Sequence, residues 1–254
     1  MAKRTIDREK AGGKKTAIDK HFSAGNGGST QQEGRMGTKT NGMLFVASDI
    51  GAGDEAEFND WYDHEHIEER ARIEGFIFAA RYICVSGGKR YLGLYRTQSL
   101  DAFTSPAYKA AFGKQTQWSV TNLKRMIDPM RRVAAVEAVT GKGSGSWISV
   151  LAMSASADLG SLVAQVSDFG SEIAKQPGVV QSYLLVPDPG LSSPLPAEQL
   201  GNRVMYPIAV IEASSREAID LAVGAARSRF GSAISAETTY ALLWKLYSAD
   251  LPVN

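Results

Sequence analysis

The sequence has few of the residues that build disulfides, metal sites and membrane spans. Its 254 residues include one cysteine, Cys84, and three histidines. A single cysteine excludes a disulfide within the chain and suits a reducing compartment, so we expect a cytoplasmic protein. No apolar run approaches the roughly 18 residues that span a bilayer. No apolar segment follows the basic N-terminus, as a secretory signal would require. The sequence therefore predicts no membrane partner.

Nucleotide-binding fingerprints are also missing. There is no P-loop, and the glycines of 141–146 lack the strand-to-helix context of a phosphate cradle. The formal net charge is +1, but residues 1–42 hold nine basic and four acidic side chains, so the remainder is mildly acidic. An acidic folded part argues against nucleic acid as a partner.

Residues 1–42 contain one aromatic side chain, Phe22, among many Gly, Lys, Ser, Thr and Gln residues. Such a segment buries too little apolar surface to offset its ordering entropy. We predict a disordered basic tail or leader. Two alternatives stay open: a basic arm for an anionic partner, or an extension upstream of a domain that begins at Met43.

From Met43 onward, one order of strands and helices is predicted twice. In the first unit, 43–140, the patterns predict strands at 43–49, 76–85, 90–97 and 132–140, and helices at 54–74 and within 100–126. A Gly/Ser linker, 141–146, precedes the second unit, 147–254. There the patterns predict strands at 147–153, 178–186, 204–212 and 238–247, and helices at 159–175 and 215–229. Each unit has the order β-α-β-β-α-β, the ferredoxin-like arrangement.

This repeat predicts how the two units pack. An antiparallel sheet with helices on one face needs something apolar to cover its other face. We therefore expect an α+β fold in which two tandem ferredoxin-like units pack their antiparallel sheets as an α/β barrel within one chain. Because the duplication supplies the partner sheet, a homodimer is compatible with the sequence but is not required.

The densest group of proton-transfer residues is the hexad Trp61-Tyr62-Asp63-His64-Glu65-His66. On a continuous helix, side chains three or four positions apart share a face. One such stripe contains Phe58, Tyr62, His66, Arg70 and Ile73. Its apolar ends predict that the stripe faces the sheet. An imidazole placed there, with an unperturbed pKa near 6.5, can act as a general acid or base.

Candidate roles follow from these positions. His66 is the candidate acid or base, with Asp63 as its orienting partner. Tyr62 and Arg70 are candidates for stabilising an enolate or carboxylate of a substrate. Three strand residues, Tyr82, Tyr95 and Arg81, are candidates for binding that substrate. A second interpretation stays open, in which His66 is a structural histidine hydrogen-bonded to the backbone or to Asp63.

Other residues near the hexad are predicted to face solvent. His64 projects about 200° around the helix from His66, so the two rings cannot bind one metal ion on an unbroken helix. We predict no metal site and no cofactor. The acidic run Glu65, Glu68 and Glu69 is predicted to be solvated, with Arg72 pairing to Glu68.

The second unit lacks an equivalent of this group. Aligning Gly75 with Gly178 places Phe169 opposite His66. We therefore expect one site per chain, with the second unit as its scaffold.

The first unit resembles a known group of proteins. The residues that carry the likeness are Phe58-x-x-Trp61-Tyr62-Asp63-x-Glu65-His66-Ile67-x-x-Arg70, Gly75-Phe76, Arg81-Tyr82 and the stretch 100–108. This pattern resembles the dimeric α/β-barrel superfamily, in particular its EthD-like branch and uncharacterised bacterial relatives. Many relatives have proline where this chain has Glu68, so here the helix is expected to continue.

The resemblance implies several possible functions for this protein. The first is a cofactor-independent enzyme that isomerises, cyclises or eliminates from a small aromatic, lactone or polyketide-like substrate. The alternative is a non-catalytic small-ligand-binding or stress-type protein of the same fold, and a third is a cofactor-free monooxygenase. Relatives that bind haem also make haem ligation by His66 conceivable, although no other residue here indicates haem.

Overall fold

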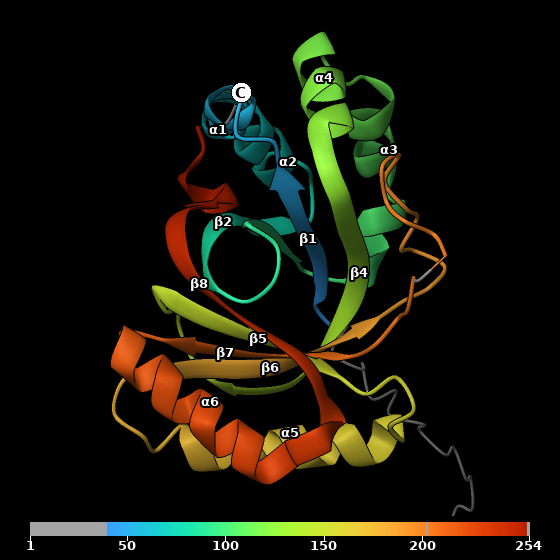
Figure 1. Ribbon diagram of the computed structural model, residues 1–254. Coiled ribbons are helices and arrows are strands. Elements are labelled where there is room, and N and C mark those ends of the chain that lie inside the picture. The colour runs from blue at the N-terminus through green and yellow to red at the C-terminus, as the bar shows by residue number, and fades with distance from the viewer. Residues whose placement is uncertain (1–39, 202, 253–254) are drawn as a thin grey trace, which may run out of the picture. The chain divides into compact units, whose positions relative to one another are not determined.

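The computed structural model describes residues 40–201 and 203–252, and its strands form a closed antiparallel barrel (Figure 1). The order around the barrel is β1-β3-β2-β8-β5-β7-β6-β4. The strands are β1 Gly42–Ile50, β2 Phe76–Ser86, β3 Tyr91–Thr97, β4 Met126–Gly141, β5 Trp147–Met153, β6 Val179–Pro187, β7 Ile208–Ala213 and β8 Ile234–Tyr247.

The barrel can be divided into a first sheet, β1–β4, and a second sheet, β5–β8, and helices cover the outer face of each (Figure 1). Those on the first sheet are α1 Glu55–Trp61, the π-helical turn η1 Tyr62–His66, α2 Ile67–Ala71, the 3₁₀ helix η2 Leu100–Thr104, α3 Pro106–Gly113 and α4 Gln117–Arg125. Those on the second sheet are α5 Leu159–Ile173 and α6 Arg216–Phe230. Two short 3₁₀ turns, η3 Gly231–Ala233 and η4 Ser248–Asp250, flank β8.

The barrel consists of two ferredoxin-like halves, which confirms the predicted fold class. In each half the fourth strand pairs with the first, the first with the third and the third with the second. The halves are joined where β4 pairs with β6 and where β8 pairs with β2. All eight strands therefore have two neighbours, and the barrel needs no second copy of the chain to close.

The two joining strands are longer than the sequence patterns predicted. β4 begins at Met126 rather than 132, and β8 begins at Ile234 rather than 238. Each strand pairs with its own half over one portion and with the other half over another. The added residues, 126–131 in β4 and 234–237 in β8, pair with β1 and β5 of their own halves, although their local pattern is not that of a strand. The second-unit strand predicted at 204–212 is β7, which starts at Ile208.

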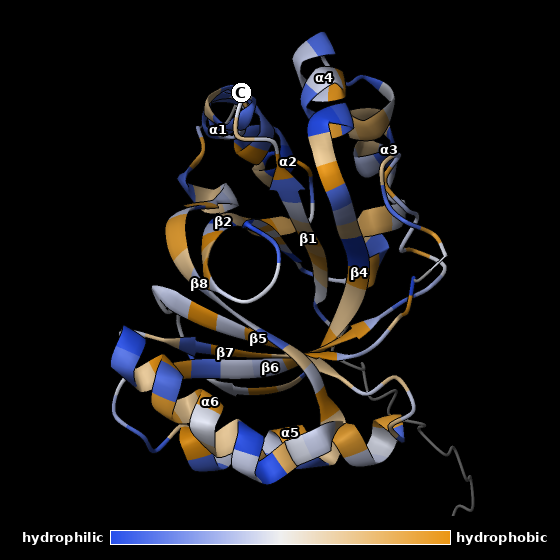
Figure 2. Ribbon diagram, in the orientation of Figure 1, coloured by the Kyte–Doolittle hydropathy of each residue, from blue (hydrophilic) through white to orange (hydrophobic). Residues whose placement is uncertain are grey.

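Alternating side chains of each strand build separate cores on its two faces. On β1, Met43, Phe45 and Ala47 point into the barrel lumen, whereas Leu44 and Val46 face the helices α1–α4. A third cluster lies between α5, α6 and the second sheet. Figure 2 shows the resulting mixture of hydrophobic and hydrophilic residues along the strands and helices. Because β1 is covered on both faces, it is almost continuously apolar.

Equivalent glycines precede the second strand of each half, as the alignment of Gly75 with Gly178 predicted. Both have positive φ angles, +87° and +83°. A Cβ on Gly75 would lie 3.2 Å from Ala102 Cβ, and one on Gly178 would lie 2.6 Å from Ala218 Cβ. Each turn therefore requires glycine both for its backbone conformation and for the close approach of the neighbouring helix.

Several other expectations fall on segments away from the site. The predicted tail, 1–42, lies almost wholly outside the described residues. Among the described residues, no helix is long and apolar enough to cross a membrane. Cys84 lies on β2, where its thiol donates to the Gly87 carbonyl oxygen (2.9 Å) and burial raises its pKa.

A glycine-to-alanine pair tests the turn before β6. We expect Gly178→Ala to lower the free energy of unfolding by about 1–3 kcal/mol, because alanine at this positive φ is strained and its methyl group meets Ala218. The control is Gly224→Ala within α6, where an added Cβ meets nothing within 4 Å. It should raise the free energy of unfolding by about 0.4–1 kcal/mol. Urea unfolding measures both, and equal effects would contradict this explanation.

Candidate functional site

A small chamber lies between the helices of the first half and the outer face of its sheet. Its volume is about 40 Å³. The lining residues are Leu44, Val46, Tyr62, His66, Arg70, Tyr95, Phe112, Gln115, Leu123, Met126, Arg131 and Leu195. We call this space the inner chamber. Of the predicted site residues, it brings together Tyr62, His66, Arg70 and Tyr95.

The register of the strands determines which of their residues form the sheet side of the inner chamber. Leu44 of β1 lies opposite Tyr95 of β3, and Val46 lies opposite Arg131 of β4. Residues paired across antiparallel strands point to the same face. Gly93 leaves room for the Tyr95 ring, since a Cβ on Gly93 would lie 3.0 Å from that ring.

The helical side of the chamber contains a π-helical turn at Tyr62–His66. The predicted stripe is buried along its whole length, from Phe58 through Arg70 to Ile73. The wider turn also buries Trp61 and Ile67 completely, which a regular helix pattern did not predict. The chain continues from η1 into α2 without a break at Glu68, as expected.

Aromatic rings surround the imidazole of His66, which is 8% exposed. Its ring centroid lies 4.3 Å from that of Trp61, 5.0 Å from Tyr62 and 6.2 Å from Tyr95. Its Nδ1 atom is buried and has no hydrogen-bond partner among the described residues. Burial, reinforced by the positive charges of Arg70 and Arg81, holds the pKa of His66 well below its usual 6.5. The imidazole is therefore neutral near neutral pH.

Two buried guanidinium groups flank Phe112 at the chamber. Arg70 lies 5.2 Å and Arg131 lies 5.9 Å from the ring centroid of Phe112. Arg131 donates to the carbonyl oxygens of Leu191 (3.0 Å) and Ser193 (2.9 Å) and to the Tyr108 hydroxyl (3.0 Å).

These two arginines have little negative charge near them. Among the described residues, Arg70 has one carboxylate within 4 Å, that of Glu69, at 3.8 Å. Within the described part of the chain, Arg131 forms no salt bridge. The Nε atoms of Arg70 and Arg131 are buried, and no group in residues 40–201 or 203–252 forms a hydrogen bond with them. The chamber is therefore electropositive and has donors to spare.

Two phenols complete the polar lining. Burial raises the pKa of Tyr62, and burial together with the neighbouring Tyr62 phenol raises the pKa of Tyr95 well above its usual 10. Both phenols therefore keep their protons and can donate hydrogen bonds. The Tyr95 hydroxyl interacts with the Tyr62 phenol but has no partner in normal hydrogen-bond geometry within the described part of the chain.

Asp63 does not contact His66, so the predicted orienting role is wrong. Its carboxylate instead accepts hydrogen bonds from Arg81 Nη1 (3.3 Å) and Trp244 Nε1 (2.8 Å). The Asp63 side chain is 45% exposed, whereas that of His66 points inward. A position three residues before His66 would have been adjacent on a regular helix, but the π-helical turn changes the angle between them.

Arg81 supports the chamber from outside. Its guanidinium carbon lies 4.2 Å from the Tyr62 ring centroid and 4.6 Å from that of Tyr91. It also donates to Asn59 Oδ1 (2.6 Å). Arg81 thus packs behind Tyr62 and does not line the chamber.

Tyr82 lies on the other face of the same strand. Its ring is buried in the lumen cluster with Leu92 and Leu94. Because neighbouring strand residues point to opposite faces, Tyr82 cannot share a site with His66. The predicted substrate-binding role of Tyr82 is wrong for this chamber.

Glu65 was predicted to be solvated, but it links the hexad to α4. Its carboxylate accepts hydrogen bonds from Trp61 Nε1 (3.2 Å), Ser119 Oγ (2.9 Å) and Thr116 Oγ1 (2.6 Å). These bonds hold the Trp61 ring against His66. The predicted pair between Arg72 and Glu68 is present, at 2.7 Å.

The sequence analysis missed Arg131 and the β6–β7 segment, 188–207. Arg131 was placed just outside a strand predicted to begin at 132. The available signal was the pair Arg131-Arg132 at the start of an apolar strand. Because neighbouring strand residues point to opposite faces of a sheet, one of these two arginines had to face the helices. Leu195 comes from the second unit, so that unit contributes to the site as well as supporting it.

A larger space, the outer groove, adjoins the inner chamber. Its volume is about 500 Å³, and α3 and the β6–β7 segment form its walls. Phe112, Gln115, Leu123, Arg131 and Leu195 line both spaces. The chamber therefore lies at the inner end of a groove that is mostly apolar.

Buried charges anchor the β6–β7 segment. Glu198 forms ion pairs with Arg132 of β4 and with Arg203 Nε (2.9 Å). It also accepts hydrogen bonds from the backbone N–H groups of Leu195 (3.2 Å) and Arg131 (3.4 Å). The carboxylate is satisfied on several sides, which offsets its desolvation.

The residues do not fit a metal ion or a haem. Over residues 40–201 and 203–252, no three His, Cys, Asp or Glu side chains gather as a metal site requires. His64 is exposed and pairs with Asp60 (2.9 Å). The inner chamber, at about 40 Å³, is far too small to hold a porphyrin beside His66.

Comparison with known proteins identifies the fold. No family model matches the chain, and no curated protein is similar to it in sequence. Among solved structures, an anthrone oxidase-like protein is similar at 12% identity and a TM-score of 0.57, covering 85% of this chain and 97% of its own. A putative monooxygenase from Lactobacillus acidophilus has 10% identity and a TM-score of 0.53, with 85% and 100% covered. A putative chlorite dismutase has 9% identity and a TM-score of 0.51, with 81% and 96% covered. These proteins share the ferredoxin-like barrel fold with this chain.

The low pKa of His66 predicts a pH dependence of stability. Below pH 6.5 the unfolded chain binds a proton at this position that the folded protein does not, so stability falls as pH falls. Between pH 8 and 5 we expect wild type to lose more stability than His66→Gln. Chemical unfolding across this range measures the difference. His64→Gln, at the exposed histidine, is the control and should retain the wild-type slope.

The Glu198 anchor predicts a second stability effect. Glu198→Ala leaves Arg132 buried without a carboxylate, so we expect a loss of about 3 kcal/mol and faster proteolysis within 188–207. Asp220→Ala removes an exposed pair with Arg216 and should cost less than about 1 kcal/mol. Similar losses in the two variants would show that the buried carboxylate does not anchor the segment.

Proposed function

We propose that this protein is a cofactor-independent enzyme that abstracts a proton from a small aromatic, lactone or polyketide-like substrate. His66 is the base, and the product of its action is an enolate or phenolate held in the inner chamber. The observation that carries the proposal is the convergence of a neutral imidazole with two buried guanidinium groups that have surplus donors. The assignment to the EthD-like branch, which rests on the motif at 58–70, is part of the proposal.

The charges of the chamber suit this reaction. A neutral imidazole accepts a proton from an acidic C–H or O–H group, and the electron pair moves onto the substrate oxygen. Arg70, Arg131 and the phenols of Tyr62 and Tyr95 then stabilise the oxyanion, since all four keep donor hydrogens near it. Arg70, whose positive charge also lowers the pKa of His66, favours a negatively charged intermediate.

Return of the proton determines the outcome. Delivery from the His66 imidazolium to a different carbon isomerises the substrate, whereas expulsion of a leaving group completes an elimination. Attack of the enolate carbon on a second carbonyl completes a cyclisation. All three reactions share the first step and require no electron acceptor.

The outer groove sets the size of the substrate. The chamber, at about 40 Å³, admits only the reacting end, whereas the groove, at about 500 Å³, accommodates a larger apolar body. Phe112 and Leu195, which line both, provide apolar contact between the two parts. Arg81 and Asp63 act as positioning residues, because Arg81 packs behind Tyr62 and Asp63 accepts a hydrogen bond from Arg81.

A cofactor-free monooxygenase is the second candidate. An enolate or phenolate enclosed by aromatic and aliphatic side chains is electron-rich, and molecular oxygen can take electrons from it directly. The likeness of the fold to that of an anthrone oxidase-like protein and a putative monooxygenase also favours this candidate. It shares the proton-abstraction step and differs in consuming oxygen.

The non-catalytic alternative has less support. A histidine retained only for packing would have its nitrogen atoms satisfied by neighbouring groups. Here His66 Nδ1, Arg70 Nε and Arg131 Nε are all buried with no hydrogen-bond partner among the residues that the structure describes. Such groups are costly to keep unless a ligand uses them.

Proton exchange tests the proposal. Anthrone, α-angelica lactone and a 1,3-diketone carry acidic C–H groups of the three substrate types, and NMR in D₂O follows their deuterium uptake beside oxygen consumption. We expect wild type to accelerate exchange of at least one probe, His66→Gln to be slower by about 100-fold or more, and Arg131→Met to be slower as well. His64→Gln is the matched control and should retain the wild-type rate.

The outcomes separate the three functions. Exchange without oxygen uptake supports an isomerase, cyclase or lyase, and exchange with oxygen uptake supports the monooxygenase. A folded His66→Gln protein with the full exchange rate would refute His66 as the base. If no probe exchanges but one raises the Tm of wild type and not of His66→Gln, the protein is a binding protein.

A further inference from the structure

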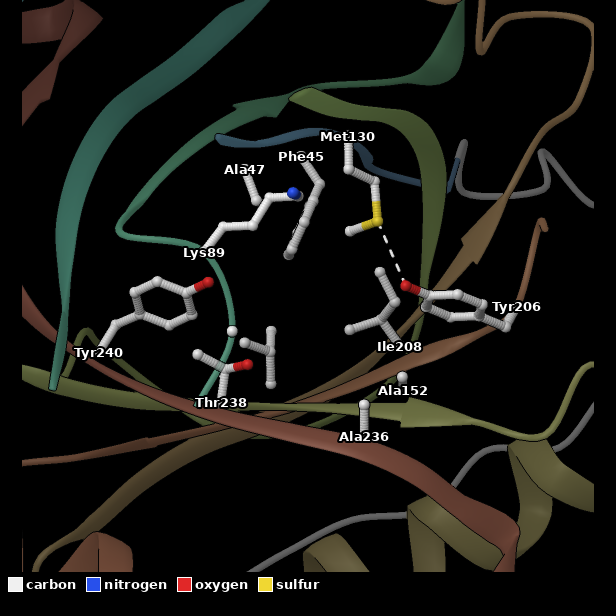
Figure 3. Close-up of a pocket in the computed structure, with 12 residues that line it drawn as sticks. Phe45, Ala47, Lys89, Met130, Ala152, Tyr206, Ile208, Ala236, Thr238 and Tyr240 are labelled. Carbon is white, nitrogen blue, oxygen red and sulfur yellow. Dashed lines mark hydrogen bonds between the residues drawn. The ribbon is translucent and has the colours of Figure 1, made fainter. Parts of the chain in front are cut away.

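A second cavity lies inside the barrel, on the opposite face of the sheet from His66. Its volume is about 160 Å³. Figure 3 shows its side chains pointing toward a common space. The lining residues come from β1, β4, β5, β7 and β8, from the β2–β3 hairpin and from the end of the β6–β7 segment: Phe45, Ala47, Gly88, Lys89, Met130, Val150, Ala152, Tyr206, Ile208, Ala236, Thr238 and Tyr240. We call this space the lumen cavity.

Strand alternation separates the lumen cavity from the inner chamber. Phe45 and Ala47 face the cavity, whereas Leu44 and Val46 of the same strand face the chamber. On β4, Met130 lies on the cavity side and Arg131 lies on the chamber side. The two spaces are thus back to back across β1 and β4.

Most of the lumen cavity is apolar, and its size matches a single ring. A cavity of about 150 Å³ lined by aliphatic and aromatic side chains stays dry and binds a molecule such as benzene. Eight-stranded barrels in general have an interior that is either filled by side chains or holds one small ligand. Here side chains such as Tyr82 and Tyr183 fill one part of the lumen, and the cavity occupies another part.

The β2–β3 hairpin and Tyr206 close this end of the barrel. A Cβ on Gly88 would lie 2.2 Å from Thr238 Oγ1, so glycine lets the hairpin rest directly on β8. The Tyr206 hydroxyl donates to Met130 Sδ (3.2 Å), as Figure 3 shows. Lys89, Met130 and Tyr206 also line a polar surface pocket of about 290 Å³, which provides a route of entry.

The charge at the rim favours a neutral ligand. Lys89 Nζ lies 2.9 Å from Asp128 and 3.7 Å from Asp49, so two carboxylates already balance its positive charge. A ligand carboxylate would have to displace one of them. The hydroxyls of Thr238 and Tyr240, in contrast, face the cavity and suit a single polar group on a ligand (Figure 3).

We propose that the lumen cavity is a second ligand site, which binds a small neutral aromatic molecule with one hydroxyl group, of the size of a phenol. The ring packs against Phe45, Met130 and Val150, and the hydroxyl reaches Thr238 or Tyr240. This site is independent of the reaction proposed for His66, and ligand binding here requires no chemistry in the inner chamber.

The test uses 4-fluorophenol with protein labelled at its methionine ¹³C-methyl groups. The chain has seven methionines, and Met130→Leu assigns the signal of Met130. We expect saturable movement of the Met130 signal and broadening of the ligand ¹⁹F line. 4-Fluorobenzoate has nearly the same shape with a negative charge, and it should bind at least about tenfold more weakly.

Adjacent residues on β1 provide matched variants. Ala47→Phe fills the lumen cavity and should weaken 4-fluorophenol binding at least about tenfold, whereas Val46→Phe fills the inner chamber and should leave that binding unchanged. If Ala47→Phe does not fold, Ala152→Leu fills the same cavity from β5.

Three results would overturn the proposal. A Met130 signal that does not respond means that the cavity takes no such ligand. Binding that is lost in Val46→Phe but kept in the cavity-filling variants places the ligand in the inner chamber. Equal or tighter binding of 4-fluorobenzoate contradicts the preference for a neutral ligand. None of these results depends on whether His66 is a base.

Discussion

Closure of the barrel is the constraint on which the rest of the structure depends. The pairings of β4 with β6 and of β8 with β2 remove the exposed strand edges of both halves. With the sheet closed, one face of every strand must point into the lumen, and the other must be covered by helices. The inner chamber is a gap in the packing between the helices and the sheet, and the lumen cavity is a gap in the packing of the lumen.

The same closure makes the candidate site a product of both halves. The β6–β7 segment leaves the second half and crosses to the first, where Leu195 reaches the chamber and Glu198 pairs with Arg132. Tyr206, near the end of that segment, closes the lumen cavity. One connection of the scaffold half thus shapes both spaces, although the polar constellation itself comes from the first half. In α5, Phe169 is buried against Phe230, which leaves the second half without a comparable group.

The positive charge of the inner chamber comes from buried arginines that have few carboxylate partners. Arg70 and Arg131 are almost completely buried with weak or no carboxylate partners, whereas Arg81, directly behind, is bonded to Asp63 and Asn59. Burial and the positive charges of Arg70 and Arg81 suppress protonation of His66, and the poorly paired Arg70 and Arg131 attract an anion. A carboxylate partner for His66, as first expected, would have raised the pKa of His66 and neutralised this effect.

Much of the fold was predictable from the sequence because it depends on local patterns. Two rounds of β-α-β-β-α-β, the matching glycines at 75 and 178 and the burial of the stripe from Phe58 to Ile73 could all be inferred from periodicity and turn chemistry. The burial of His66, Tyr62 and Arg70 beside the sheet follows from the same stripe, and Tyr95 was a correct candidate for the lining.

Other features were decided only by the tertiary structure. The π-helical turn directs Asp63 away from His66, because one extra residue per turn changes the angles that a regular helix predicts. The face to which Tyr82 or Arg131 points depends on strand register, which is set by pairing partners distant in the sequence. The sequence by itself therefore determined which groups lie on the central helix, since helix periodicity is a local property. Strand pairing and barrel closure decided which of them meet, because these contacts join segments that are far apart along the chain.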